Sequence, residues 1–468
     1  MRRDVSTPSG GSGPLQLPLR TKLLFASSHI GSDALGRSRA LWLLYYYVPP
    51  KDAHLPHILP GLVFALLFAA GSVVGSLDLV IVGYFSDRTR SRWGRRIPYV
   101  LAGTPLWALF ALLLFTPPTH SGAALAGLYF FVVFELFFLF QTVSGAPYEA
   151  LLPELAPTSA ERVSLQSYKV YFGVVGTTIG LVGSYFLRDH VGFKWMALTM
   201  AGLALIFRYI GIFGVWGRAK QSRIPAELTF RDALAATFRN VPFRILLPSV
   251  VLFAIAFDLL QAVIPFYVHA TLPKSTWLTG RWLVAIAIAA AVGCVPLFKR
   301  LAARTTKRDA YRWSMLAGAL TFPLLAVAGV IPGIPREIQI VIAVALIGAP
   351  IGAHYLFPIP LYADVIDQDS GRTKLRREAT YLGAQGFVET TATSIALPLL
   401  VLLRLLGDTR DHSLGVRLVG PVGGLIIFGG WLLFRAYRLS DNVRERVPPQ
   451  AVEPEELPAA ETAVGPAG

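Results

Sequence analysis

The feature that most constrains this chain is a succession of long apolar runs separated by short polar loops. A helix that spans a bilayer needs roughly 20 mostly apolar residues. With 468 residues, 54% of them hydrophobic, the chain carries more apolar surface than the interior of a soluble domain can hide. We therefore expect an all-α polytopic membrane protein with about twelve transmembrane helices. The predicted helices are Leu24–Val48, Ile58–Phe85, Tyr99–Phe115, Ala123–Gly145, Gln166–Leu187, Trp195–Trp216, Phe243–His269, Trp282–Phe298, Tyr311–Ile331, Ile338–Tyr362, Ala379–Leu403 and Gly415–Arg435.

Lysine and arginine are concentrated in four loops, after the second, sixth, eighth and tenth predicted helices. Cytoplasmic loops carry an excess of basic residues, so these loops and both termini are predicted to lie in the cytoplasm, on the inner side of a bacterial-type inner (plasma) membrane. The net charge of +15 does not indicate a nucleic-acid partner, because the charges sit between apolar runs rather than on one solvated face. The expected partner is the lipid bilayer, and the chain is expected to be a monomer.

A basic segment divides the chain between the sixth and seventh predicted helices. We predict a helical bundle over residues 23–217, a cytoplasmic linker over 218–242 and a second bundle over 243–438. A weak repeat supports the division, because basic loops precede both 101–103 and 316–318, which share the sequence Leu-Ala-Gly. The polar ends of the chain, 1–22 and 439–468, are predicted to be disordered cytoplasmic tails.

Three loop segments form one pattern. They are SDRTRSRWGRR at 86–96, PYEALLPEL at 147–155 with ERV at 161–163, and ADVID at 363–367 with RRE at 376–378 and YLG at 381–383. In content and spacing they resemble the cytoplasmic loops of the glycoside-pentoside-hexuronide:cation symporters, the melibiose-permease-like branch of the major facilitator superfamily. The resemblance covers all the predicted helices. It implies two six-helix bundles around a central cavity and secondary transport of a sugar or glycoside by alternating access.

Arginines and carboxylates in these loops can pair in one conformation and separate in another. Each exposed pair contributes only ~0.2–1 kcal/mol, but a cluster of pairs would bias an outward-open against an inward-open state. A compatible alternative is that these residues set the orientation and contact lipid headgroups. The predicted cytoplasmic gate consists of Asp87, Arg88, Arg92, Arg96, Glu154, Arg162, Asp364, Asp367 and Arg377.

Ionisable side chains inside the predicted helices are the candidates for the transport site, since each costs at least ~2.5–3.5 kcal/mol to insert. His29, Asp33 and Arg37 follow one another in steps of four, which places them on one face of the first helix. Asp33 can neutralise Arg37 within that helix. The resemblance places Asp33 at the aspartate that binds sugar hydroxyls, and the alternative is a structural Asp33–Arg37 pair without a substrate role.

Other charges and aromatic side chains extend the candidate set. Lys169 lies near the arginine of the family's fifth helix, and Glu389 lies near the position of a lysine in its eleventh helix, which this chain lacks. For each acid the alternative is a helix–helix hydrogen bond or a place at the membrane interface. The substrate-binding candidates are Asp33, Arg37, Tyr46, Glu149, Lys169 and Glu389, and the candidates for cation or proton coupling are Asp33, Asp78, Glu135 and Asp258.

The coupling ion is predicted from what the chain lacks. Carboxylates of the family's second helix fall at Gly75 and Leu79, and the aspartate of its fourth helix falls at Gly145. A sodium ion needs several oxygen ligands together, whereas a proton needs one carboxylate. We therefore expect a proton, with sodium as the alternative, or transport without a coupling ion.

Other classes of protein fit less well. The acidic triplet at 367–369 imitates a metal-binding motif of glycosyltransferases, but it lies inside the third loop segment, and the chain has no phosphate-binding Walker loop. An enzyme, a pump, a cofactor and a bound metal are therefore not expected. The remaining alternative is a transporter of a lipid or amphipathic solute on the same fold, because several charges of the sugar transporters are missing.

Overall fold

The computed structural model describes residues 17–89, 91–118, 122–156, 159–219, 237–273, 276–373 and 378–439. Every regular element in these ranges is a helix, as the sequence predicts. Most of each predicted tail, most of the predicted linker and Arg377 fall on residues 1–16, 440–468, 220–236 and 374–377, outside the described residues. The side chain of Asp87 is also outside the description.

The helices form two groups along the chain. The N-terminal helices are α1 (Leu19–Tyr47), α2 (Gly61–Arg88), α3 (Ile97–Leu113), α4 (Ala123–Glu149), α5 (Leu151–Leu155), α6 (Ser159–Thr178), the π-helix η1 (Ile179–Gly183) and α7 (Ser184–Ala219). The C-terminal helices are α9 (Val241–Thr271), α10 (Gly280–Gly293), α11 (Val295–Arg304), α12 (Lys307–Thr321), α13 (Leu324–Val327), α14 (Arg336–Leu356), α15 (Pro358–Thr373), α16 (Glu378–Thr393), α17 (Ala396–Arg404) and α18 (Leu414–Phe434).

All twelve predicted ranges fall on helix, but the helix ends differ. Helix α1 begins at Leu19 rather than Leu24, because hydropathy locates the lipid-embedded stretch while the helix continues past it. The fifth and sixth predicted helices join through α7, where the chain turns at Gly192 with a φ of 82° that glycine adopts readily. Seven helical stretches of the described chain are long and apolar enough to cross a membrane. The count of twelve crossings stays a prediction.

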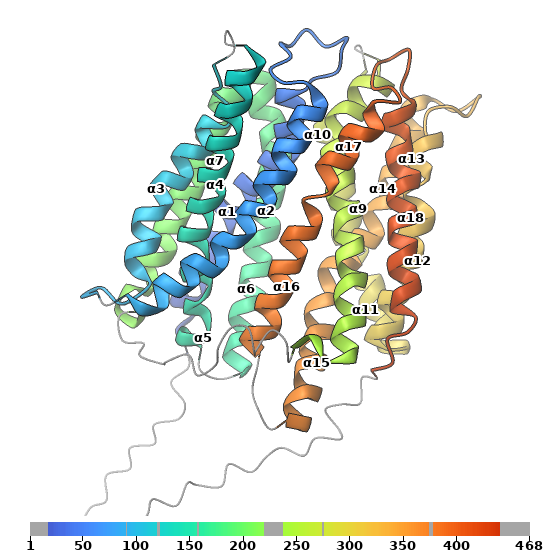
Figure 1. The fold of residues 1–468 in the computed structure, drawn as a ribbon. Helices are drawn as coiled ribbons and strands as arrows, with labels where there is room; N and C mark the ends of the chain where they lie inside the picture. The colour runs from blue at the N-terminus through green and yellow to red at the C-terminus, as the bar shows by residue number, and fades with distance from the viewer. Residues whose placement is uncertain are drawn as a thin grey trace, which may run out of the picture.

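Helix α1 lies where the two groups meet. Figure 1 shows the N-terminal helices on the left and the C-terminal helices on the right, and α1 contacts α6, α7 and α9. We call the end with the start of α1 and the basic loop 88–96 the lower end. The upper end carries the loop 49–60 and the loop between α17 and α18 (Figure 1). The basic loop 88–96 and the acidic and basic residues of α15 therefore share the lower end.

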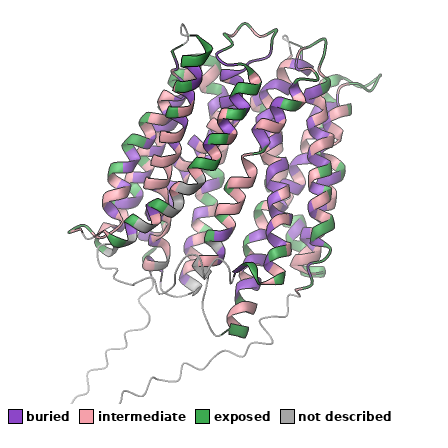
Figure 2. Cartoon of the chain, in the orientation of Figure 1, coloured by how far each residue is buried: buried purple, intermediate pink, exposed green. Residues whose placement is uncertain are grey.

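The outer surface of the described helices is apolar. Leu66 of α2 is 72% exposed and Leu128 of α4 is 61% exposed, and Figure 2 shows exposed residues along the outward sides of the helices. Soluble monomers rarely expose contiguous apolar surface of this kind, whereas lipid-facing helices do. The chain is an integral membrane protein.

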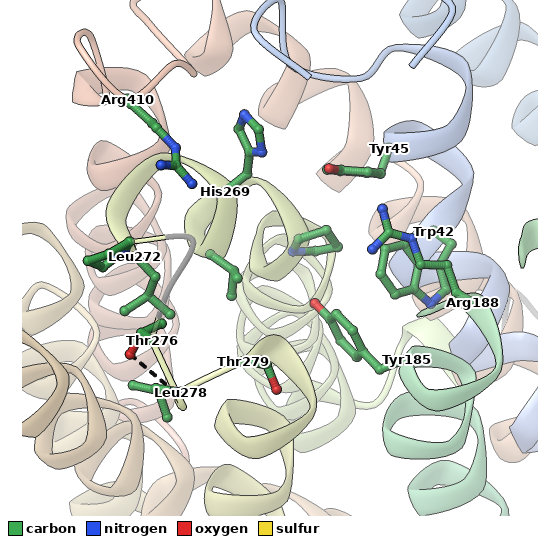
Figure 3. A pocket seen from close by; sticks show the side chains of 13 residues that line it. Trp42, Tyr45, Tyr185, Arg188, His269, Leu272, Thr276, Leu278, Thr279 and Arg410 are labelled. Atoms are coloured by element: carbon green, nitrogen blue, oxygen red, sulfur yellow. Dashed lines mark hydrogen bonds between the residues drawn. The ribbon is translucent and has the colours of Figure 1, made fainter. Parts of the chain in front are cut away.

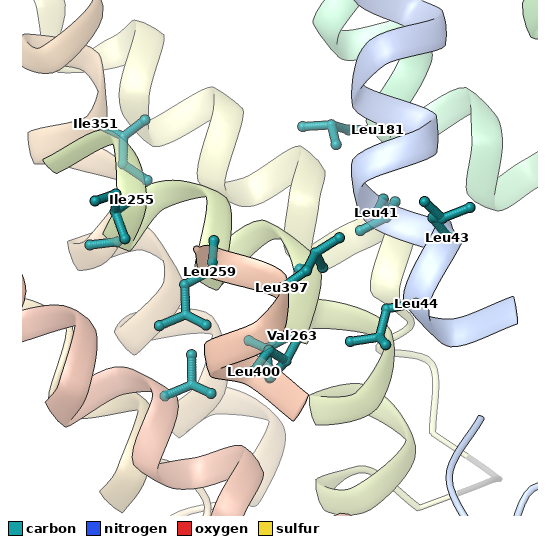
Figure 4. Packing of buried hydrophobic residues seen from close by; sticks show 14 of the residues in the cluster. Leu41, Leu43, Leu44, Leu181, Ile255, Leu259, Val263, Ile351, Leu397 and Leu400 are labelled. Atoms are coloured by element: carbon teal, nitrogen blue, oxygen red, sulfur yellow. The ribbon is translucent and has the colours of Figure 1, made fainter. Parts of the chain in front are cut away.

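Buried aliphatic residues join the two groups of helices. Figure 4 draws Leu41 and Leu44 of α1 with Val263 of α9 and with Leu397 and Leu400 of α17. Helix α9 contacts both α1 and α17, and each of these side chains is at most 6% exposed. Apolar burial of about 25 cal/mol per Å² is the main stabilising contribution of such contacts. The seam formed by α1, α9 and α17 therefore holds the groups together toward the upper end.

Polar contacts at the upper end continue this seam. His269 of α9 hydrogen-bonds to Asp52 Oδ1 at 2.8 Å, and Arg404 of α17 donates to the carbonyl oxygen of Pro49 at 3.3 Å. The rings of Tyr45 and Phe266 lie 5.1 Å apart. The upper end is thus a place where the N-terminal and C-terminal helices touch.

Candidate functional site

A charged cluster occupies one face of α1 between the N-terminal helices. His29 Nε2 lies 3.2 Å from Glu149 Oε1 at the end of α4, and its Nδ1 lies 4.0 Å from Asp33 Oδ2. Glu149 also forms an ion pair with Lys169 of α6. We call these four residues the α1 cluster. It brings three predicted substrate-binding residues together, and they come from three different helices.

Arg37 lies one turn further along α1 and reaches the C-terminal helices. Its guanidinium lies 3.4 Å from Asp258 Oδ1 and donates to Gln261 Oε1 at 3.3 Å and to the hydroxyl of Tyr355 at 3.1 Å. The contact expected between Arg37 and Asp33 is replaced by these. Spacing by four residues puts two side chains on one face, but the long arginine side chain extends past Asp33 to partners on α9 and α14.

Glycines on α6 and η1 let α1 approach closely enough to build the site. A Cβ atom at Gly173 would lie 2.6 Å from Asp33 Oδ2, and one at Gly176 or Gly180 would collide with the backbone of α1. Small residues at helix interfaces allow backbones to come together in membrane proteins. The carboxylate of Asp33 therefore occupies space that only glycine at position 173 leaves free.

The acids of the α1 cluster keep solvent-accessible surface although they are central. The side chains of Asp33 and Glu149 are 39% and 43% exposed, while that of Lys169 is 8% exposed. The face of α1 that carries Asp33 also carries Arg37, which points to the C-terminal helices rather than to lipid. The carboxylate oxygens of Asp33 and Glu149 are therefore accessible and can accept hydrogen bonds from a solute.

The remaining predicted site residues lie outside the α1 cluster, some within reach of Arg37 and others further away. Glu389 of α16 accepts a hydrogen bond from Gln385 at 3.4 Å and lies within electrostatic reach of Arg37 and Asp258. Glu135 of α4 faces Gly71 of α2 and lies within electrostatic reach of Asp78. Tyr46 donates to the carbonyl oxygen of Phe115 at 3.0 Å, near the upper end of the N-terminal helices. In this structure Asp78, Glu135 and Tyr46 are not members of the α1 cluster.

Sequence reasoning missed two polar residues that support the site. Arg208 of α7 is 5% exposed, donates to the Ser32 hydroxyl at 2.9 Å and lies 4.5 Å over the ring of Tyr148. Gln261 of α9 makes two hydrogen bonds to Arg37. Its side-chain oxygen accepts from the guanidinium, and its side-chain NH2 donates to the backbone carbonyl oxygen of Arg37. A charge inside an apolar helix was the signal that identified Asp33, and the same signal applies to Arg208.

Ion pairs within one group of helices include three residues of the predicted gate, which are Arg96, Glu154 and Asp364. Arg95 and Arg96 lie 2.5 Å and 2.8 Å from Glu154 Oε1, and Lys307 lies 2.6 Å from Asp364 Oδ2. The remaining described members have separate positions. Arg92 lies over the ring of Trp93, Arg162 donates to the carbonyl oxygen of Ala156, and Arg88 and Asp367 are exposed.

The fold matches that of a solved transporter structure. The structure matches a solved mutant of the nucleoside transporter NupG with a TM-score of 0.63 over 90% of this chain and 99% of that one, at 12% sequence identity. An identity this low shows a shared fold alone. The described helices therefore share the fold of that transporter structure.

The family follows from the sequence match. Residues 24–407 match the family described as MFS/sugar transport protein, and the chain belongs to this family. It resembles the glycoside-pentoside-hexuronide symporters, as the loop motifs predict, and the family is one of transporters rather than enzymes.

Relatives of known name are transporters of more than one solute. The chain is 31% identical over 172 residues to an uncharacterized symporter of Synechocystis sp., covering 36% of this chain and 30% of that protein. It is 25% identical over 323 residues to the lactose permease of Lactobacillus helveticus, covering 63% and 48%. It is 26% identical over 381 residues to the sphingosine-1-phosphate transporter MFSD2B of Mus musculus, covering 75% and 73%. The chain thus spans less than half the length of the first two.

Proposed function

We propose that this protein is a secondary transporter that moves a sugar, a glycoside or a similar small polar solute by alternating access. The observation that carries the proposal is the exposed pair of acids, Asp33 and Glu149, beside the Arg37 contacts to the C-terminal helices. Carboxylates accept sugar hydroxyls and a guanidinium donates to sugar oxygens. The permease and symporter names among the relatives support this class of solute.

The same contacts supply a way to couple binding to movement. Arg37 connects α1 to Asp258 and Tyr355, so a solute that takes over its hydrogen bonds changes how strongly the two groups of helices hold each other. A solute shifts a conformational equilibrium only by its different affinity for the two states. Competition for Arg37 is one source of that difference.

A proton is the proposed coupling ion, with transport without an ion as the alternative. Gly75, Leu79 and Gly145 offer no side-chain oxygen where the family's cation ligands fall. Asp33 is an accessible carboxylate next to His29, and one carboxylate is enough to carry a proton.

The experiment is uptake by the purified protein in lipid vesicles over a panel of labelled sugars and glycosides. We expect saturable uptake of at least one of them that is lost in Asp33→Asn. Asp411→Asn, an acid exposed in the loop between α17 and α18, is the control and should transport normally. Uptake of none of the panel by a folded protein would refute a sugar as the solute.

A second candidate solute is a lipid or an amphipathic molecule. It is favoured by the match to a sphingosine-1-phosphate transporter, which covers more of the relative's length than the match to lactose permease does. Uptake by the same vesicles distinguishes a sugar from a lipid as the solute. If the solute is a lipid, a lysophospholipid or a phosphorylated long-chain base is transported and the sugars are not.

The proposed orientation places the lower end in the cytoplasm of a bacterial-type inner membrane, because the basic loops lie there. Gly94→Cys in the loop 88–96 tests it. A membrane-impermeant thiol reagent should label this cysteine in inverted vesicles and not in intact cells, and labelling in intact cells would reverse the orientation.

A further inference from the structure

A pocket lies at the upper end, between the N-terminal and C-terminal helices (Figure 3). Its volume is about 270 Å³. None of the α1 cluster lines it, so it is separate from the proposed transport site. We call it the upper pocket. Its lining is formed by Trp42, Tyr45, Tyr185, Arg188, Pro265, Val268, His269, Leu272, Pro273, Thr276, Leu278, Thr279 and Arg410.

Two buried hydroxyls in the upper pocket lack a partner among the described residues. Tyr185 is 4% exposed and Figure 3 shows its hydroxyl directed into the pocket. The hydroxyl of Thr279, at the start of α10, is also buried and without a hydrogen bond in the described chain. Gly280 leaves room for the phenol, since a Cβ there would lie 2.5 Å from its oxygen. Buried polar atoms normally have a partner, so both hydroxyls are available to a ligand.

The charged residues of the pocket are cationic. Arg188 of α7 and Arg410 of the loop between α17 and α18 lie on opposite sides of it (Figure 3). Arg188 is fixed over the ring of Trp42 at 5.2 Å, and its ion pair with Asp189 uses part of its five N–H donors. The guanidinium of Arg410 has no hydrogen bond or ion pair within the described part of the chain. The described lining residues include no aspartate or glutamate.

We propose that the upper pocket binds a small anion that carries a carboxylate or a phosphate group. Guanidinium groups match both in a bidentate geometry, and the hydroxyls of Tyr185 and Thr279 supply further donors. The volume lies just below the range of pockets for drug-sized ligands, so the anion is no larger than a monosaccharide acid. An anion held by Arg188 and Arg410 joins the two groups of helices and favours the conformation in which the upper ends touch.

The test is calorimetric titration of the purified full-length protein in detergent, at constant ionic strength in chloride, with inorganic phosphate, with glucuronate and with glucose. We expect saturable binding of phosphate, of glucuronate or of both that depends on Arg410. Glucose carries no charge, so any heat it gives comes from the α1 cluster and should be the same in wild type and Arg410→Gln. The two anions distinguish a phosphate from a carboxylate ligand. Binding should also raise the unfolding temperature, because a ligand that binds only the folded state stabilises it. Absence of saturable binding by both anions would overturn the proposal.

Variants assign the binding to this pocket. Arg410→Gln should weaken it roughly tenfold or more, the loss typical of one hydrogen bond to a charged group, and Tyr185→Phe should weaken it without changing the charge. Lys51→Gln is the control, because Lys51 is exposed in the loop 49–60 and does not line the upper pocket. Equal affinity in Arg410→Gln and wild type, or equal losses in Arg410→Gln and Lys51→Gln, would refute the site. Asp33→Asn should bind the anion normally, so this result does not depend on the transport proposal.

Discussion

Replacing Arg37 with glutamine should loosen the contact between the two groups of helices. Arg37 makes three hydrogen bonds to the C-terminal helices, at 3.4, 3.3 and 3.1 Å, to Asp258, Gln261 and Tyr355. Its side chain is 27% exposed and that of Asp258 is 30% exposed, so the pair is worth more than a surface ion pair and less than a fully buried one. We estimate a loss of about 1.5–3 kcal/mol, which is roughly a 10- to 150-fold rise in the population with separated upper ends.

Thiol labelling of the protein in detergent measures this population. Cys294 is the single cysteine of the chain, so Cys294→Ser with Val268→Cys leaves one thiol in the upper pocket. Its labelling rate should rise in Arg37→Gln by the factor given above. Asp258→Asn should act similarly, and the double variant should be less than additive because the two residues share one contact.

Two controls separate this effect from general loosening. Arg39→Gln removes the same charge from the same helix, but its guanidinium lies over the rings of Phe137 and Phe138 on α4, so the labelling rate should stay near that of the parent. A cysteine at His57, exposed in the loop 49–60, should react equally fast in all variants. An unchanged rate at position 268 in Arg37→Gln would refute the reasoning, as would an equal rise in Arg39→Gln.

Three further perturbations follow from the structure. Gly173→Ala should impair transport strongly, because its Cβ would lie 2.6 Å from the carboxylate of the α1 aspartate, while Gly183→Ala, with its nearest neighbour at 3.7 Å, should transport normally in the same assay. Arg88→Gln in the predicted gate should lower the maximal transport rate more than it changes the half-saturating solute concentration, and the reverse pattern would contradict a conformational role. Burial raises the pKa of Asp52, but the hydrogen bond and charge of His269 and a backbone N–H outweigh it and hold the pKa below its usual value. The stability that Asp52 contributes should therefore be present above about pH 4 and be lost as the pH falls further. The difference in unfolding temperature between wild type and Asp52→Asn should shrink on acidification, and a difference that grows would contradict this.

Individual residues of the α1 cluster could be predicted from the sequence, but their partners could not. A charge inside an apolar helix identifies Asp33 by its insertion cost, and that criterion needs no tertiary information. The contact of Arg37 with Asp258 joins residues 221 positions apart, and helical spacing carries no information about such a distance. Helical spacing therefore predicts Asp33 as the partner of Arg37, whereas tertiary packing supplies partners from α9 and α14.

The upper pocket could not be predicted for a different reason. Tyr185, Arg188 and Arg410 stand at helix ends and in a loop, where aromatic and basic residues ordinarily meet the membrane interface. Only the approach of α7 and α10, made possible at Gly280, turns them into the walls of one cavity. The helix ends were predicted least well, because hydropathy reports the apolar stretch and not the capping residues beyond it.

The measurement that tests the account most directly is solute accumulation by the reconstituted protein under imposed ion gradients. Vesicles that hold a pH gradient should accumulate the transported solute, and vesicles that hold only a sodium gradient should not, because Gly75, Leu79 and Gly145 offer no side-chain oxygen where the family's cation ligands fall. Asp33→Asn should insert and fold and should fail to accumulate the solute. Accumulation driven by sodium, or full accumulation by Asp33→Asn, would contradict proton-coupled transport through the α1 cluster.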